Sequence, residues 1–180
     1  LAPRSRVDDV VPRLVRLVRR HTVGSDLPTV LMGDSAGGAL SLVLAQRLDE
    51  PPARVVPLCP WLDATLEQPE VAGLDATDPM LNETGLRAAG RWWARPRDPR
   101  DPVVSPVNGD LAALPRVDLF VADRDILRPA VDLFCQRAEQ AGVDLRVREV
   151  TAMFHVWMTR LIPEAVRTRR ELVGLLREVA

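Results

Sequence analysis

The sequence contains no lysine, and all 24 of its basic residues are arginines. This absence excludes a phosphate-binding P-loop, which needs a lysine, and any catalysis through a lysine Schiff base. Acidic and basic residues nearly balance, with a formal net charge of -1 over 180 residues. The composition therefore lacks the excess of positive charge that is typical of nucleic-acid-binding proteins, and no nucleic-acid partner is expected.

Cysteine and histidine are also scarce, with two of each in the chain. Cys59 and Cys135 lie far apart and do not form the disulfide framework of a small secreted domain, so we expect reduced thiols and a cytoplasmic location. His21 and His155 do not have the spacing of a zinc motif, and neither a metal nor an organic cofactor is predicted. No apolar run approaches the roughly 20 residues of a membrane span.

What the chain does contain is an alternation of short apolar runs and amphipathic stretches. Strands are predicted over 27–33, 53–60, 115–122 and 143–150. Helices are predicted over 8–20, 36–48, 128–141 and 163–179. Because strands alternate with helices and most of the strand patterns are apolar on both faces, we expect an α/β fold with a mostly parallel sheet.

Two segments depart from this simple alternation. Pro12 falls within the first helical pattern, so Asp8 or Asp9 is expected to cap the helix and to leave the proline in its first turn. Residues 61–114 are rich in proline and charge, with one helical piece around 83–93. We expect this segment to be an irregular excursion over one end of the sheet, within a single domain that spans 1–180.

The most informative motif is Gly33-Asp34-Ser35-Ala36-Gly37, followed by Gly38. The pattern Gly-x-Ser-x-Gly between a strand and a helix is typical of a nucleophile elbow, a sharp turn that exposes a serine hydroxyl at the end of a sheet. The backbone N–H of Ala36, at a helix N-terminus, could donate to an oxyanion. The alternative interpretation is a glycine-rich turn that only packs the helix against the strand.

A serine nucleophile needs a base, and the base needs a carboxylate that orients it. Asp125 and His155 each follow a predicted strand, at the carboxyl ends where open α/β sheets bind ligands. The chain order serine, aspartate, histidine is that of α/β-hydrolases, whereas trypsin-like proteases have the serine last. A lone histidine after a strand is more often structural, and Asp123 is a competing carboxylate two residues from Asp125.

The sequence resembles the hormone-sensitive-lipase-like esterases and lipases of the α/β-hydrolase superfamily. Four motifs carry the resemblance: GDSAGG at 33–38, DPVVSPVNGDLAALP at 101–115, ADRDIL at 122–127 and AGVDLRVREVTAMFHVWM at 141–158. The resemblance extends over almost the whole chain and implies a partial α/β-hydrolase fold with its four C-terminal strands. They also imply Ser35 as nucleophile, His155 as general acid and base, and Asp125, in preference to Asp123, as the orienting carboxylate. Asp123 would then be exposed to water at the end of its loop.

One feature of that family is missing. Its members carry an H-G-G-G loop upstream of the elbow, whose amides complete the oxyanion hole, and the sequence contains no such motif. We therefore expect the chain to correspond to the C-terminal portion of the catalytic domain, with the Ala36 amide as the oxyanion donor that it supplies. The apolar strand 27–33, central in the family, would then lie at an edge of the sheet.

The predicted function is hydrolysis of carboxylic esters through an acyl-enzyme, and the resemblance implies short-to-medium acyl esters as substrates and allows a homodimer. Candidates for the substrate pocket flank the ends of predicted strands: Trp61, Phe154 and Val156. Trp92, Trp93 and Trp157 could equally line a pocket or pack in the core. Two alternatives remain open: an inert fragment or ligand-binding module on the same fold, and a serine peptidase of the prolyl-oligopeptidase type.

Overall fold

The computed structural model describes residues 3–22 and 25–179. Four parallel strands form one sheet in the order β1-β2-β3-β4. The strands are β1 (Val30–Asp34), β2 (Arg54–Leu58), β3 (Val117–Ala122) and β4 (Leu145–Val150). The helices are α1 (Val7–Thr22), α2 (Ala36–Ala45), α3 (Val71–Asp75), α4 (Glu83–Ala94), α5 (Arg128–Gln140) and α6 (Pro163–Arg177), with two 3₁₀ turns, η1 (Pro106–Asn108) and η2 (Trp157–Thr159). The predicted α/β fold with a parallel sheet is confirmed, and none of the helices in the described ranges is both long and apolar enough to cross a membrane.

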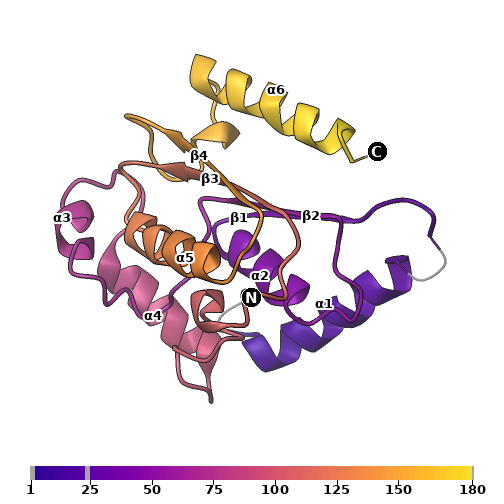
Figure 1. Cartoon of the computed structure of the whole chain (residues 1–180). Helices are drawn as coiled ribbons and strands as arrows, with labels where there is room; N and C mark the ends of the chain where they lie inside the picture. The colour runs from indigo at the N-terminus through magenta and orange to yellow at the C-terminus, as the bar shows by residue number, and fades with distance from the viewer. Residues whose placement is uncertain (1–2, 23–24, 180) are drawn as a thin grey trace.

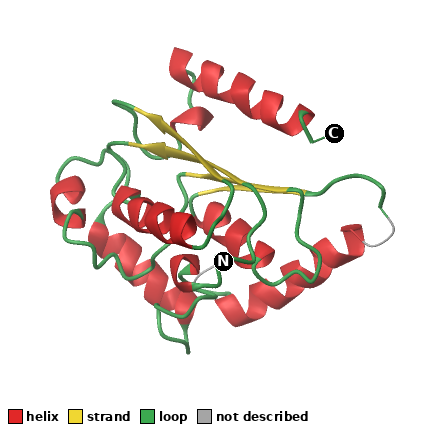
Figure 2. Ribbon diagram, viewed as in Figure 1, coloured by secondary structure: helices red, strands yellow, loops and turns green. Residues whose placement is uncertain are grey.

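Helices cover both faces of this sheet (Figure 1; Figure 2). Val55 and Leu119 pack on one face in a buried cluster with residues of α2 and α5. Val56 and Phe120, the next residues along the same strands, pack on the other face in a cluster with residues of α6. Because successive strand residues point to opposite faces, a sheet covered on both sides must be apolar at nearly every position. Every residue of β2 and β3 is buried, and the two charged residues among them, Arg54 and Asp118, form an ion pair at 3.4 Å.

The two edges of the sheet differ in character. β1 forms one edge and leaves the side chain of Met32 50% exposed, in agreement with the edge position expected for the strand predicted at 27–33. β4 forms the other edge, where Arg146, Arg148 and Glu149 interrupt the apolar pattern. Charged residues on an edge strand discourage pairing with another chain, and β4 carries three of them where β1 has Asp34 alone.

Helix α1 begins at Val7, before the aspartates that were predicted to cap it. Pro12 therefore lies inside the helix, and the prediction that it occupies the first turn is wrong. Val7 and Val11 are buried in a cluster with residues of α2 and α4. The carboxylate of Asp9 instead accepts the backbone N–H of Arg6 at 3.0 Å. Since a proline in a helix removes one backbone hydrogen bond and kinks the chain locally, burial of this apolar face outweighs the loss.

In the segment 61–114, the helical piece predicted around 83–93 is α4, and the segment also contains α3 and η1, which its sequence did not indicate. Helix α4 packs directly on the chain after β2, because a Cβ added at Gly90 would lie 2.8 Å from the carbonyl oxygen of Ala64. A further buried cluster joins this segment to the loop after β3 through Leu66, Val71, Ile126 and Leu127. The segment is therefore attached to the loops that follow β2 and β3, where the predicted site residues lie.

Candidate active site

One candidate residue follows each strand of the sheet at its carboxyl end. Ser35 comes directly after β1, Cys59 directly after β2, and Asp125 and His155 lie in the loops after β3 and β4. All three strand pairs are parallel, so the carboxyl ends of the four strands lie at the same end of the sheet. The fold therefore brings residues from four distant parts of the sequence to this carboxyl end of the sheet, in the order of the strands.

The turn at Ser35 has an unusual backbone conformation, with φ 52° and ψ −118°. A residue with a side chain rarely adopts a positive φ, and such strain persists only where the surroundings impose it. The Ser35 N–H donates to the carbonyl of Leu58 at 2.9 Å, and its carbonyl accepts from the N–H of Trp61 at 3.0 Å. A Cβ on Gly33 would lie 2.4 Å from the carbonyl carbon and oxygen of Gly37. This turn has the backbone geometry expected of a nucleophile elbow.

The other predicted elbow residues divide into those that packing requires and those that it does not. A Cβ on Gly38 would lie 2.9 Å from the Cβ of Pro60, so α2 can approach the chain after β2 only with glycine here. Asp34 is exposed, and a Cβ on Gly37 would meet its Oδ1 at an ordinary 3.7 Å. Ala36 is exposed at the first position of α2, where a backbone N–H has no partner within the helix.

His155 and Asp125 form a buried pair, with 2.7 Å between Nδ1 of the imidazole and Oδ2 of the carboxylate. The exposed fractions of the two residues are 3% and 0%. The second carboxylate oxygen of Asp125 accepts the backbone N–H of Leu127 at 3.0 Å. Because an ionised carboxylate can only accept, the imidazole must carry its proton on Nδ1, which leaves Nε2 able to accept one. The pair therefore has the tautomer that a general base requires.

The competing carboxylate, Asp123, has a different partner. Its Oδ2 accepts the backbone N–H of Ala152 at 2.9 Å, and the residue is half-buried, so the expectation that it is simply exposed to water is wrong. β3 and β4 pair up to Ala122 and Val150, so the two following loops leave the sheet side by side and can bond to each other. Asp123 thus joins these loops, whereas Asp125 contacts the imidazole itself.

Cys59 lies against the buried pair, a contact that the sequence analysis missed because its partners are far along the chain. Its sulfur, the imidazole of His155 and the carboxylate of Asp125 have ligand atoms within 4.8 Å of one another. The sulfur accepts the backbone N–H of Val156 at 3.4 Å. Burial, and next the negative charge of Asp125, raise the pKa of the Cys59 thiol far above its usual range, so it is an uncharged neighbour at neutral pH.

These three side chains are also the group that could hold a soft divalent metal ion, since thiolate, imidazole and carboxylate are all zinc ligands. Nδ1 of His155 and Oδ2 of Asp125 are, however, engaged with each other. A metal ion would have to replace the proton between them and remove one from Cys59. The hydrogen-bonded pair needs neither change, and it suits proton transfer as it stands.

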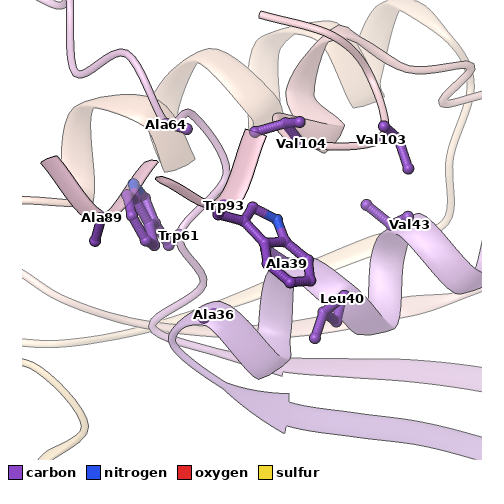
Figure 3. Close-up of a pocket in the computed structure, with 10 residues that line it drawn as sticks. All are labelled: Ala36, Ala39, Leu40, Val43, Trp61, Ala64, Ala89, Trp93, Val103 and Val104. Atoms are coloured by element: carbon purple, nitrogen blue, oxygen red, sulfur yellow. The ribbon is translucent and has the colours of Figure 1, made fainter. Parts of the chain in front are cut away.

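An apolar cavity of about 110 Å³ opens beside the start of α2 (Figure 3). Its lining comes from α2, α4 and the chain on either side of α4: Ala36, Ala39, Leu40, Val43, Trp61, Ala64, Ala89, Trp93, Val103 and Val104. Trp61 was predicted to line a pocket, and its Nε1–H donates to the carbonyl of Asp63 at 2.9 Å. Figure 3 shows the ring of Trp93 projecting toward α2. The cavity is adjacent to Ser35 because Ala36, the next residue, lines it.

Two of the predicted pocket residues lie elsewhere. Phe154 and Val156 pack in the buried cluster between the sheet and α6, and neither lines the apolar cavity. The chain that leaves β4 turns toward the face covered by α6, whereas the cavity lies on the opposite face beside α2. The sequence placed both residues near a strand end but could not indicate which face of the sheet they would join.

Comparisons with known proteins agree with this geometry. A profile of the family described as alpha/beta hydrolase fold matches residues 3–159. The chain is 33% identical over 131 residues to an acetyl-hydrolase of Streptomyces hygroscopicus, a match that covers 71% of this chain and 44% of the relative. It is 30% identical over 164 residues to the carboxylesterase/phospholipase LipF of Mycobacterium tuberculosis, covering 83% of this chain and 43% of the relative.

Solved structures show the same similarity. The crystal structure of EstE7, a hormone-sensitive-lipase homologue from a metagenome library, superposes with a TM-score of 0.91 at 26% identity and covers 99% of this chain and 64% of that one. A hormone-sensitive lipase from a metagenome library gives a TM-score of 0.86 at 28% identity, covering 97% of this chain and 62% of that one. The chain spans about half the length of the curated relatives that it matches.

Proposed function

Because the chain belongs to the α/β-hydrolase fold family and is similar to its hormone-sensitive-lipase-like esterases, we propose that it carries the serine, histidine and aspartate of a carboxylic-ester hydrolase. The observation that supports this most strongly is the buried hydrogen bond of 2.7 Å between His155 and Asp125, at the same end of the sheet as the strained turn of Ser35. Acyl transfer needs a serine nucleophile on an elbow and a general base, which here is an imidazole oriented by a carboxylate.

In the first half-reaction, Oγ of Ser35 attacks the ester carbonyl carbon while Nε2 of His155 takes the hydroxyl proton. The carbonyl oxygen becomes an oxyanion, and the Ala36 N–H donates to it. Asp125 accepts from Nδ1–H and stabilises the imidazolium that forms. The tetrahedral intermediate then collapses, the bond to the alkoxy group breaks, and the leaving alcohol takes the proton from Nε2. The product of this step is an ester of Ser35.

In the second half-reaction, water replaces the serine as nucleophile. Nε2 of His155 removes a proton from the water as it attacks the acyl carbon, and the same nitrogen returns that proton to Oγ of Ser35 when the acid leaves. The enzyme is thus restored with no net change in protonation. The Ala36 amide is the oxyanion donor that this chain supplies, and the family's further donors come from the H-G-G-G loop that the sequence does not contain.

The apolar cavity beside Ala36 supports esters with a short-to-medium apolar acyl or alcohol group as the substrate class. Its volume of about 110 Å³ suits a chain of a few carbons, and its walls are alanine, valine, leucine and tryptophan side chains. Trp93 projects into it from α4 (Figure 3), so this ring limits the space available to the substrate.

Replacement of Ser35 tests the proposed chemistry. Hydrolysis of p-nitrophenyl acetate, butyrate and octanoate, and of a peptide anilide, is measured for the protein and for Ser35→Ala. We expect ester hydrolysis to exceed anilide hydrolysis and to fall at least about 10³-fold in Ser35→Ala. Ester hydrolysis that survives in Ser35→Ala would remove this serine from the mechanism, and faster anilide cleavage would indicate a peptidase.

The pocket has a matched control in the neighbouring tryptophan. Trp93→Ala enlarges the cavity, so kcat/KM for octanoate relative to butyrate should rise about tenfold, the discrimination that apolar pockets commonly give. Trp92 is 47% exposed and does not line the cavity, so Trp92→Ala should leave the ratio unchanged. An equal change in both variants would show that the cavity does not hold the apolar group.

A further inference from the structure

A carboxylate outside the predicted triad holds the backbone beside Asp125. Oδ2 of Asp78, in the turn after α3, accepts the N–H of Ile126 at 2.9 Å, a contact across 48 residues of sequence. Its other oxygen, Oδ1, accepts the N–H groups of Met80 and Leu81 at 2.8 and 2.9 Å. Both oxygens are therefore used by backbone amides, two within the turn of Asp78 and one in the loop that carries Asp125.

The bond to Ile126 acts on the peptide unit that follows the triad carboxylate. The N–H of that unit donates to Asp78, and its carbonyl, which belongs to Asp125, accepts the N–H of Arg128 at 2.9 Å. Because a peptide unit is planar, a bond at each end fixes its orientation and with it the ψ angle of Asp125. The carboxylate of Asp125 is then presented to His155 from a backbone that cannot rotate freely.

Packing reinforces this contact from the same side. Ile126 and Leu127 are buried in a cluster with Leu66 and Val71, and Leu81 of the Asp78 turn packs against it. The segment 61–114 therefore contacts the loop after β3 both through a hydrogen bond to a carboxylate and through apolar side chains. An ionised acceptor makes a stronger hydrogen bond than a neutral one. Asp78 supplies the polar contact between the segment and this loop.

We propose that Asp78 is a positioning residue that keeps the carboxylate of Asp125 in hydrogen-bonding contact with the imidazole of His155. The inference rests on the proposed function for its kinetic consequence, but the contact that it concerns exists in the free protein. Without Asp78, the Ile126 N–H loses its acceptor and the peptide unit can rotate, so the carboxylate of Asp125 spends less time against Nδ1. The base is then wrongly oriented for part of the time, and the rate falls although Ser35 and the cavity are intact.

The end of α3, just before the turn of Asp78, provides a matched control. Oδ1 of Asp75 accepts the N–H of Glu83 at 2.6 Å, so it too is a half-buried carboxylate bonded to a backbone amide, but both partners lie within the segment 61–114. Asp78→Ala should lower kcat about 10-fold to 100-fold with little change in KM, the size of effect that follows small misplacement of a catalytic group. Asp75→Ala should change kcat by less than about twofold, and Asp78→Asn, which keeps one of the two oxygens, should lie between Asp78→Ala and the unmodified protein.

The split between kcat and KM separates positioning from general loss of structure. Asp78 contacts the loop that carries Asp125 and does not line the apolar cavity, so its removal should misplace the base and leave substrate binding unchanged. A general structural defect would raise KM as well as lower kcat.

A measurement without substrate keeps the inference distinct from the proposed function. In a proton NMR spectrum, an Nδ1–H bonded to a carboxylate gives a resonance far downfield of the amides. We expect it in the unmodified protein and in Asp75→Ala, and expect it to be lost or broadened by exchange in Asp78→Ala. Persistence of the signal and of an unchanged kcat in Asp78→Ala would overturn the inference. If Asp78→Ala does not fold, Asp78→Asn decides by the same two readouts.

Discussion

The serine side and the histidine side of the candidate site are built in different ways. On the serine side, the steric contact that shapes the turn lies between near neighbours in sequence, Gly33 and Gly37. Two backbone hydrogen bonds then attach Ser35 to Leu58 and Trp61 of the chain after β2, and β1 lies at an edge of the sheet. On the histidine side, the contacts that assemble the site join distant parts of the chain: Asp125 to His155, Asp123 to Ala152, Cys59 to Val156 and Asp78 to Ile126.

This difference shows that one site can depend both on a short sequence motif and on contacts between residues far apart in the sequence. A local turn needs a few residues of the right size, so it is specified by a short motif and fails when one of them gains a side chain. A pair of buried polar groups needs each partner to be supported by a further contact, because an unpaired polar group in the interior is costly. The serine side should therefore respond to steric changes, and the histidine side to lost hydrogen bonds.

The largest effect is expected from adding a methyl group inside the elbow. In Gly33→Ala, the new Cβ would lie 2.4 Å from backbone atoms of Gly37, and backbone cannot move aside as a flexible side chain can. We expect the free energy of unfolding to fall by about 3 kcal/mol, at the upper end of overpacking costs. Gly37→Ala is the control, because its Cβ meets only Oδ1 of Asp34 at 3.7 Å. Urea denaturation should show a change within about 1 kcal/mol for the control, and an equal loss in both variants would refute the steric account.

A smaller effect is expected from removing the bond that joins the two loops on the histidine side. Asp123→Ala leaves the N–H of Ala152 without its acceptor at 2.9 Å, and Ala152 has a strained φ of 61°. We expect a loss of about 1 kcal/mol in stability, a usual value for one hydrogen bond, with a reduction in kcat/KM of about fivefold. In Asp110→Ala, a similar carboxylate bond to Ala112 is lost in an exposed loop. If Asp110→Ala lowered kcat/KM as much, the loop connection would have no special importance.

The smallest effect concerns the two thiols. Burial, and next the charge of Asp132, raise the pKa of Cys135 to about 11, while the pKa of Cys59 is raised further by burial and by Asp125. Since both folded-state pKa values lie above the unfolded value, the stability that the thiols contribute is fully present below about pH 8.5 and is lost as the pH rises through the folded values. Alkylation by iodoacetamide, followed by mass spectrometry, should be slow for both at pH 8 and should reach Cys135 before Cys59 as the pH rises. Faster modification of Cys59 would contradict its placement against the buried pair.

The sequence predicted the parts of the fold that depend on local pattern. Apolar runs predicted three of the strands, an alternating pattern predicted the fourth, and the motif around Ser35 predicted a turn between β1 and α2. These signals all lie within about ten residues. Pro12 was placed wrongly because the burial of Val7 and Val11 decides where α1 begins, and burial is a property of the folded chain. Local sequence pattern therefore predicted the strands and the turn at Ser35, whereas tertiary packing decided where α1 begins.

The remainder of the site could not be predicted because its contacts are not local. From the residues alone, Asp123 and Asp125 were competing carboxylates two positions apart, and the family resemblance favoured Asp125. The folded loops show that Asp125 meets His155 and that Asp123 meets Ala152. The contact of Asp78 with Ile126 spans 48 residues and has no motif. Phe154 was assigned to a pocket because it flanks the end of a predicted strand, but the face of the sheet on which it packs follows from the path of the loop toward α6.

The central claim is that Ser35 and His155 act together, and covalent labelling tests it most directly. A fluorophosphonate should modify the protein, and peptide mapping by mass spectrometry should locate the phosphonyl group on Ser35. His155→Ala should slow the labelling by about 10³-fold or more, because the serine then lacks its base. A phosphonyl group on another residue, or Ser35 labelled at an unchanged rate in His155→Ala, would contradict the account.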